Sequence, residues 1–155
     1  MTLEAYQRPD KLPGGAHGRI AKLLDLKTND KSDDLWLADQ VANGLKTKSA
    51  DALCVLLGRS NIVGPLIPEA TLRRAAKTAK KCLSKEMSER LYEVTKVLDA
   101  VSTAYRGDTD AITRFLHNPH QLLDGRSPYE VAISSSAGSD VVLGLIRRAQ
   151  AGIAL

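Results

Sequence analysis

Aromatic residues are scarce in this chain and make up 4% of its 155 residues. The apolar core must therefore come from Leu, Val, Ile and Ala, a composition that favours helices over a β-sandwich. No apolar run approaches the ~20 residues that a membrane-spanning helix needs, so we expect no membrane partner. With 43% hydrophobic and 26% charged residues, the composition also excludes a disordered or collagen-like chain.

Cysteine is equally rare, because only Cys54 and Cys82 occur. Both lie in helical patterns, which suits reduced thiols in a cytoplasmic protein better than a disulfide framework. Residues 1–7 show no basic stretch followed by an apolar block. We therefore expect no secretory signal and a cytoplasmic location.

The charge is unevenly distributed along the chain. The net charge of +4 decides little. However, residues 73–85 contain six basic residues and no acidic one, whereas residues 91–155 contain six basic and seven acidic residues. A basic block beside a nearly neutral half predicts two surfaces with two kinds of partner.

The N-terminal region has weak patterning. Proline and glycine interrupt residues 9–18, residues 27–34 are almost wholly polar, and an apolar helical spacing occurs only at 20–24. We interpret residues 1–43 as an N-terminal arm that is partly mobile in isolation. Its role stays open between packing on the next region, extending a dimer interface and remaining mobile.

Regular helical signals begin at residue 35. The first predicted helix has an inner face formed by Leu35, Ala38 and Val41. Ser49 is the predicted N-cap of a short helix that ends at Gly58. Pro68 favours the first turn of a further helix, which we expect to run to Lys81.

The strongest periodicity follows Ser84, the predicted N-cap of a long helix that ends before Gly107. One apolar stripe with spacings of 4, 3, 4, 3 and 4 is formed by Met87, Leu91, Val94, Leu98, Val101 and Tyr105. A helix over 109–117 and another after Ser127 are predicted by their apolar spacing and by a capping box.

A last helix is predicted from about Ser139, with Val142, Leu145, Ile146 and Ala149 inward, to Gly152. No segment alternates long enough to predict a strand. The predicted fold is all-α.

Residue patterns typical of enzymes are missing. His117 and His120 flank Pro119 without a nearby cysteine or carboxylate, so we interpret them as loop histidines that cap or pack rather than as metal ligands. Residues 134–136 form a serine run that lacks a nucleophile elbow, and we expect a polar helix exit there. No glycine-rich phosphate loop follows a strand. We expect no catalytic residue, metal or cofactor.

The basic block resembles the second helix of a helix-turn-helix, which offers polar and basic side chains to the major groove while flanking cations contact phosphates. The candidate DNA-binding residues are Thr71, Arg73, Arg74, Lys77, Lys80 and Lys81. A solvated basic face is the alternative interpretation of the same residues.

Residues 44–155 resemble a known family, the Xre/MbcA/ParS type of antitoxin that partners RES-domain toxins. The first motifs are Pro-x-x-Thr-Leu-x-Arg, matched by Pro68, Thr71, Leu72 and Arg74, and Leu-Ser-x-Glu-x-Ser-x-Arg-Leu, matched by Leu83–Leu91. The later ones are matched by Tyr105, Gly107 and Asp108, by Ala111, Phe115 and Leu116, by Asn118–Pro119, by Leu123, Gly125 and Pro128, and by Gly152. Residues 64–66 and Phe115 depart from the family, which often has an apolar helix with a glycine turn and a tryptophan there.

The resemblance implies an antitoxin with two functions. A helix-turn-helix half, 44–100, would bind the promoter of its own operon as a homodimer. A C-terminal half, 101–155, would bind a toxin that consumes NAD and occlude its active-site cleft. The implied toxin-binding residues are Arg126, Arg147, Arg148, Ala151, Gly152, Ile153, Ala154 and Leu155.

Physical chemistry agrees with this assignment in part. The tail 151–155 is small and apolar, and is narrow enough to enter a cleft. Arg147 and Arg148 could pair with acidic groups around that cleft, or simply sit favourably at a helix C-terminus. The alternative function, from a different class, is a DNA-binding regulator without a toxin partner.

Overall fold

The computed structural model describes residues 1–152, and this part of the chain is helical with no strand. In chain order, its elements are η1 (Leu3–Gln7), η2 (Pro9–Lys11), α1 (Ala16–Leu23), α2 (Asp34–Ala42), α3 (Thr47–Leu57), α4 (Arg59–Ile62), α5 (Glu69–Lys77), α6 (Lys85–Ala104), α7 (Thr109–His117), η3 (Gln121–Leu123), α8 (Pro128–Ser134) and α9 (Ser136–Gln150), where η denotes a 3-10 helix. The all-α prediction is confirmed. None of the helices in residues 1–152 has both the length and the apolar character needed to cross a bilayer.

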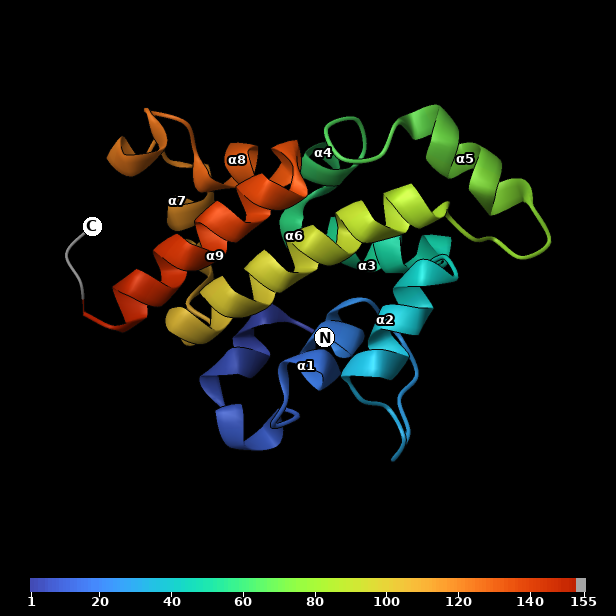
Figure 1. Cartoon of the computed structure of the whole chain (residues 1–155), viewed down its shortest axis with the longest axis horizontal. Helices are drawn as coiled ribbons and strands as arrows, with labels where there is room; N and C mark the ends of the chain where they lie inside the picture. The colour runs from blue at the N-terminus through green and yellow to red at the C-terminus, as the bar shows by residue number, and fades with distance from the viewer. Residues whose placement is uncertain (153–155) are drawn as a thin grey trace.

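Helix α6 is the central element of the fold (Figure 1). It packs against α8 and α9 on one side and against α1 and α2 on the other. Its predicted stripe is buried from Leu91 to Val101. The Ser84 hydroxyl accepts a hydrogen bond from the Met87 amide at 3.1 Å, so the predicted N-cap is confirmed. The sequence thus defines the axis of the molecule through local signals alone.

The N-terminal segment is packed into the core. Leu3, Tyr6 and Leu24 are buried in the same hydrophobic cluster as α6. Gly107 permits the approach of η1, since its φ is +73° and a Cβ there would lie 2.6 Å from the Leu3 carbonyl oxygen. Of the roles left open for residues 1–43, packing on the core is the one observed, while mobility of the segment in isolation stays a prediction. Short 3-10 turns bury residues without a helical period, which explains why the pattern was weak.

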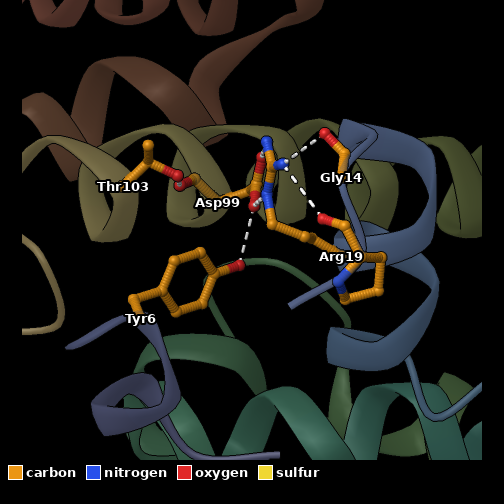
Figure 2. Close-up of polar contacts among 6 residues, drawn as sticks. Tyr6, Gly14, Arg19, Asp99 and Thr103 are labelled. Carbon is orange, nitrogen blue, oxygen red and sulfur yellow. Dashed lines mark hydrogen bonds and ion pairs between the residues drawn. The ribbon is translucent and has the colours of Figure 1, made fainter. Parts of the chain in front are cut away.

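Polar contacts among Tyr6, Arg19 and Asp99, called the clasp below, join this segment to α6 (Figure 2). The Arg19 guanidinium donates to both carboxylate oxygens of Asp99, from Nε at 2.8 Å and from Nη2 at 3.1 Å. The Tyr6 hydroxyl donates to the same carboxylate at 2.7 Å. Burial, together with the Asp99 charge, raises the pKa of Tyr6 above its ordinary value. The hydrogen bond to Asp99 raises the pKa of Arg19. The clasp therefore combines the Arg19–Asp99 ion pair with a phenol that keeps its proton.

Two local predictions about the helices before α4 are corrected by the structure. In α2 the buried residues are Leu37 and Val41, while Leu35 and Ala38 are exposed. Ser49 lies inside α3 instead of capping it, because its hydroxyl donates to the Leu24 carbonyl oxygen at 2.6 Å.

The serine run is likewise not simply a helix exit. Ser135 is the N-cap of α9 and accepts from the Gly138 amide at 2.9 Å. The last helix therefore starts earlier than the predicted Ser139, which is buried within it. At its other end Ala149 is exposed rather than inward.

The domain boundaries at residues 43 and 100 stay predictions. Helix α6 runs across residue 100. One hydrophobic cluster contains Leu3 and Leu24, Leu53 and Leu98, and Ile146. The three predicted regions therefore share one continuous hydrophobic core.

Candidate functional site

Helix α5 projects at one end of the long axis of the molecule (Figure 1). Its only buried residue is Leu72, at 7% exposure, and Ala75 packs partly beside it. The remaining faces of the helix are open to solvent, apart from the half-buried Thr71. A helix anchored by one leucine contributes little to the core, which leaves nearly its whole surface free for a partner.

The exposed surface of α5 is cationic. Arg73, Arg74 and Lys77 are all exposed, and none has an ion-pair partner within residues 1–152. Thr71 is half-buried, so its side chain is less accessible to a partner than those of the three cations. Three unpaired cations on one short helix form a surface that attracts phosphate groups.

The helix ends before the last two predicted DNA-binding residues. It was expected to reach Lys81 but stops at Lys77. Thr78 terminates it, since its hydroxyl donates to the Ala75 carbonyl oxygen at 2.8 Å and accepts from the Lys81 amide at 3.1 Å. Lys80 and Lys81 therefore lie in an ordered turn rather than on the helix. Lys81 has a φ of +52°, a left-handed conformation that costs a side-chain-bearing residue about 1 kcal/mol.

The connection from α3 to α5 is longer than the short turn that joins the two helices of a helix-turn-helix. The one-turn helix α4 intervenes, and a small loop follows it. The Gly64 amide donates to the Ile67 carbonyl oxygen at 2.8 Å and closes this loop. Gly64 and Pro65 thus shorten the helix that would precede the recognition helix.

A basic residue outside the predicted block, Lys46, pairs through its backbone with the segment that follows the turn after α5. Residues 45–47 and 81–83 lie antiparallel, with a bridge between Lys46 and Cys82. The Thr47 amide donates to the Lys81 carbonyl oxygen at 2.9 Å. Lys46 is exposed. Nothing in its local sequence indicated this neighbour, because the pairing is long-range.

The predicted toxin-binding residues lie toward the opposite end of the molecule. In Figure 1, η3 and the C-terminal end of α9 lie at the end away from α5. Arg147 and Arg148 are exposed in the last turn of α9. The Arg126 side chain is exposed, and its Nε donates weakly to the Leu123 carbonyl oxygen at 3.4 Å.

The tail is described only at its start. Ala151 and Gly152 are exposed, and the Gly152 amide donates to the Ala149 carbonyl oxygen at 3.1 Å. Ile153, Ala154 and Leu155 lie outside the described residues. The predicted tail site is therefore only partly placed.

Exposed apolar side chains also occur on the elements of that end. Tyr105, which follows α6, is 39% exposed and packs on Phe115 with ring centroids 5.9 Å apart. Leu122 of η3 is 52% exposed. Large exposed side chains of this kind are common anchors of protein interfaces. The sequence placed Tyr105 at the end of the buried stripe of α6, where its exposure was not evident.

No family model, curated protein or solved structure matches this chain. Its function must therefore be inferred from its exposed groups and their placement.

The histidines act as cap and packing partner, as the sequence predicted. The His120 Nδ1 accepts from the Leu122 amide at 3.2 Å, and the His117 ring lies 5.2 Å from the Tyr129 ring. Cys54 is a free thiol whose pKa is raised by burial, so it stays protonated and weakly nucleophilic. Residues 1–152 contain no group of three or more His, Cys, Asp or Glu arranged to hold a metal ion.

Proposed function

We propose that this chain is a cytoplasmic antitoxin that binds DNA through α5 and a RES-domain toxin through its C-terminal half. The observation that carries the proposal is the pair of separated surfaces: an unpaired cationic helix at one end and an arginine-bearing helix terminus toward the other. The resemblance of residues 44–155 to Xre/MbcA/ParS antitoxins names the partners. The protein acts by binding alone and uses no cofactor.

On the DNA side, α5 enters the major groove of the promoter of its own operon. Helix geometry places Arg73 about a quarter turn from the buried Leu72 and Arg74 on the opposite face, so both are free to reach guanine edges or phosphates. The chain binds as a homodimer, since helix-turn-helix proteins usually read two half-sites. Binding of the dimer represses the operon.

On the toxin side, the C-terminal half occludes the active-site cleft where the toxin consumes NAD. Arg147 and Arg148 pair with acidic groups at the rim of the cleft, and residues 151–155 enter it. Arg126 contacts the toxin from the turn before α8. Exposed Tyr105 and Leu122 supply apolar contact area around these charges.

Reversing the α5 charges tests the DNA function. We expect the variant R73E/R74E/K77E to lose binding to a duplex of the operon promoter while it still binds toxin, because only the phosphate-facing cations change. A matched control reverses the exposed Lys11, Lys22 and Lys27, which lie in the N-terminal segment. Unchanged promoter affinity of the α5 variant, in a gel-shift titration at fixed salt, would contradict the recognition-helix assignment.

Co-expression tests the toxin function. A pull-down with the product of the adjacent gene should recover a RES-domain protein, and the full chain should restore growth under that toxin. Deletion of residues 152–155 should weaken the rescue. Full protection by the truncated chain would contradict occlusion by the tail. Promoter binding without any toxin partner would favour the alternative, a stand-alone regulator.

A further inference from the structure

A hollow of about 500 Å³ lies between the N-terminal 3-10 helices and the C-terminal end of α1. Part of its lining is apolar and comes from Met1, Ala5, Leu12 and Leu26. Leu12 and Leu26 pack against the hydrophobic core but stay half-exposed. The volume lies within the range of about 300–1,000 Å³ that is usual for small-molecule sites. The hollow therefore presents apolar surface that a ligand of this size would remove from water.

The rest of the lining is mainly cationic. Arg8, Lys11 and Lys22 line the hollow, all three are exposed, and none of them has an ion-pair partner within residues 1–152. Asp25 is the one acidic residue in the described lining, and its carboxylate lies 3.8 Å from the Nζ atom of Lys48, a residue outside the lining. Three uncompensated cations around one hollow attract an anion.

The backbone that carries these cations is held in place. The Lys11 amide donates to the Arg8 carbonyl oxygen at 3.0 Å, so the two residues stand at the ends of one turn. Lys22 lies in the last turn of α1. Both elements are anchored in the same hydrophobic cluster, η1 through the buried Tyr6 and α1 through the buried Leu23. A site whose backbone is already ordered loses little conformational entropy when a ligand binds.

The mixture of apolar and cationic lining restricts the class of ligand. An inorganic anion would leave Leu12 and Leu26 in water, and an uncharged apolar molecule would leave the three cations without a partner. A DNA duplex would reach the cations but would not cover the apolar residues, because these line a concave surface. Insertion into a membrane needs apolar side chains that project, whereas Leu12 and Leu26 are half-buried.

We infer that this hollow binds a small amphipathic anion, an apolar body such as a short hydrocarbon chain that carries one carboxylate or phosphate group. The apolar body covers Leu12 and Leu26, and the head group lies among Arg8, Lys11 and Lys22, which hold it by charge-assisted hydrogen bonds. The planar guanidinium of Arg8 suits both head groups, since it can bind two oxygens at once. The inference does not depend on the proposed binding of DNA or of a toxin.

The test is isothermal titration calorimetry of the full chain with straight-chain carboxylates from butanoate to decanoate, each below its micelle-forming concentration. We expect the affinity to rise by up to about fourfold for each methylene group until the hollow is filled. The heat capacity change of binding should be negative. Acetate and 1-octanol should each bind more weakly than octanoate, because each meets only one of the two kinds of lining. Tighter binding of either decanoate or decyl phosphate supports the inference and identifies the preferred head group.

Two substitutions locate the site. Arg8→Gln and Lys22→Gln each remove one charge from the lining, and we expect each to weaken octanoate binding by about two- to fivefold. Lys31→Gln is the matched control, since Lys31 is exposed in the loop between α1 and α2 and does not line the hollow. It should keep the wild-type affinity.

Several results would overturn the inference. These are an affinity that does not change with chain length, wild-type octanoate affinity in both R8Q and K22Q, and 1-octanol binding as tight as that of octanoate. Binding to phosphatidylglycerol vesicles without binding to monomeric decanoate or decyl phosphate would assign the cations to a membrane surface and overturns it as well. None of these results bears on the R73E/R74E/K77E variant or on toxin capture, so the proposed function is tested separately.

Discussion

Asp99 is an acidic residue on the buried side of a long amphipathic helix, between Leu98 and Val101. Its charge is matched by Arg19 and its remaining acceptor capacity is used by Tyr6. The apolar stripe of α6 could be predicted from local spacing. The clasp could not, because its members come from residues 6, 19 and 99, which no local pattern connects. The only local sign of these contacts was the position of Asp99 between Leu98 and Val101, two residues of the predicted apolar stripe.

Removing the Asp99 carboxylate should strongly destabilise the fold. Asp99→Ala leaves a partly buried guanidinium and a buried phenol without their acceptor, which we expect to lower the free energy of unfolding by about 2–3 kcal/mol. Urea unfolding measures the loss. The exposed Asp39→Ala serves as control and should change stability by no more than about 0.5 kcal/mol. Equal effects of the two substitutions would show that the clasp is not a significant source of stability.

The two buried tyrosines should make the protein sensitive to alkali. Burial raises the pKa of both Tyr6 and Tyr129 above the ordinary value of 10.0. The folded chain therefore keeps these protons where the unfolded chain releases them. Their contribution is fully present below pH 10 and is lost as the pH rises above it, by about 1.4 kcal/mol per pH unit for each tyrosine.

Substitution by phenylalanine isolates this effect. Tyr129→Phe removes one titrating group and one hydrogen bond to the Asn61 carbonyl oxygen. We expect a lower free energy of unfolding at pH 8 but a shallower decline between pH 10 and pH 11.5, measured by urea unfolding. Tyr105→Phe, at an exposed site, should keep the wild-type decline. A wild-type decline in Tyr129→Phe would contradict the burial argument.

At the scale of elements, local capping signals predicted the starts of α6 and α8 but not those of α3 and α9. Ser84 and Ser127 cap their helices through side chains that contact only the next turn, so the local sequence was sufficient. The end of α5 depended on Thr78, whose hydroxyl bonds both into the helix and into the following turn. The continuous basic composition through Lys81 concealed that stop. The sequence therefore showed that the predicted DNA-binding residues are basic, but it did not show which of them lie on the helix and which lie in the turn.

The junction between the α3 and α6 starts should depend on Gly44. Gly44→Ala would place a Cβ against the Leu83 carbonyl oxygen and strain the left-handed backbone, so we expect a loss of about 2–4 kcal/mol in the free energy of unfolding. Gly64→Ala is the matched control. Gly64 has a φ of +105° with nothing within 4 Å, and it should cost only about 1 kcal/mol. Chemical denaturation compares the two, and similar losses would contradict a close backbone approach at Gly44.

At the scale of the whole molecule, α6 joins two surfaces with different chemistry. Helix α5 and its basic turn precede the start of α6, while Tyr105 and α7 follow its end. Because both surfaces belong to one continuous core, the distance between them is fixed by a 20-residue helix. A partner at one end therefore has no steric reason to exclude a partner at the other.

This separation predicts that toxin and DNA bind at the same time. Adding the RES-domain toxin to the chain bound to promoter DNA should produce a slower band in a native gel, not free DNA, because α9 and α5 end at opposite ends of the long axis. R73E/R74E/K77E should lose DNA binding, and the 152–155 deletion should weaken toxin binding. In the combined variant, the change in binding free energy for each partner should match that of the single variant within about 0.5 kcal/mol. Toxin that displaces the DNA, or a deletion that changes promoter affinity, would mean that the two surfaces are coupled through the core. In that case the effect should be reciprocal, so that promoter DNA lowers toxin affinity by the same factor.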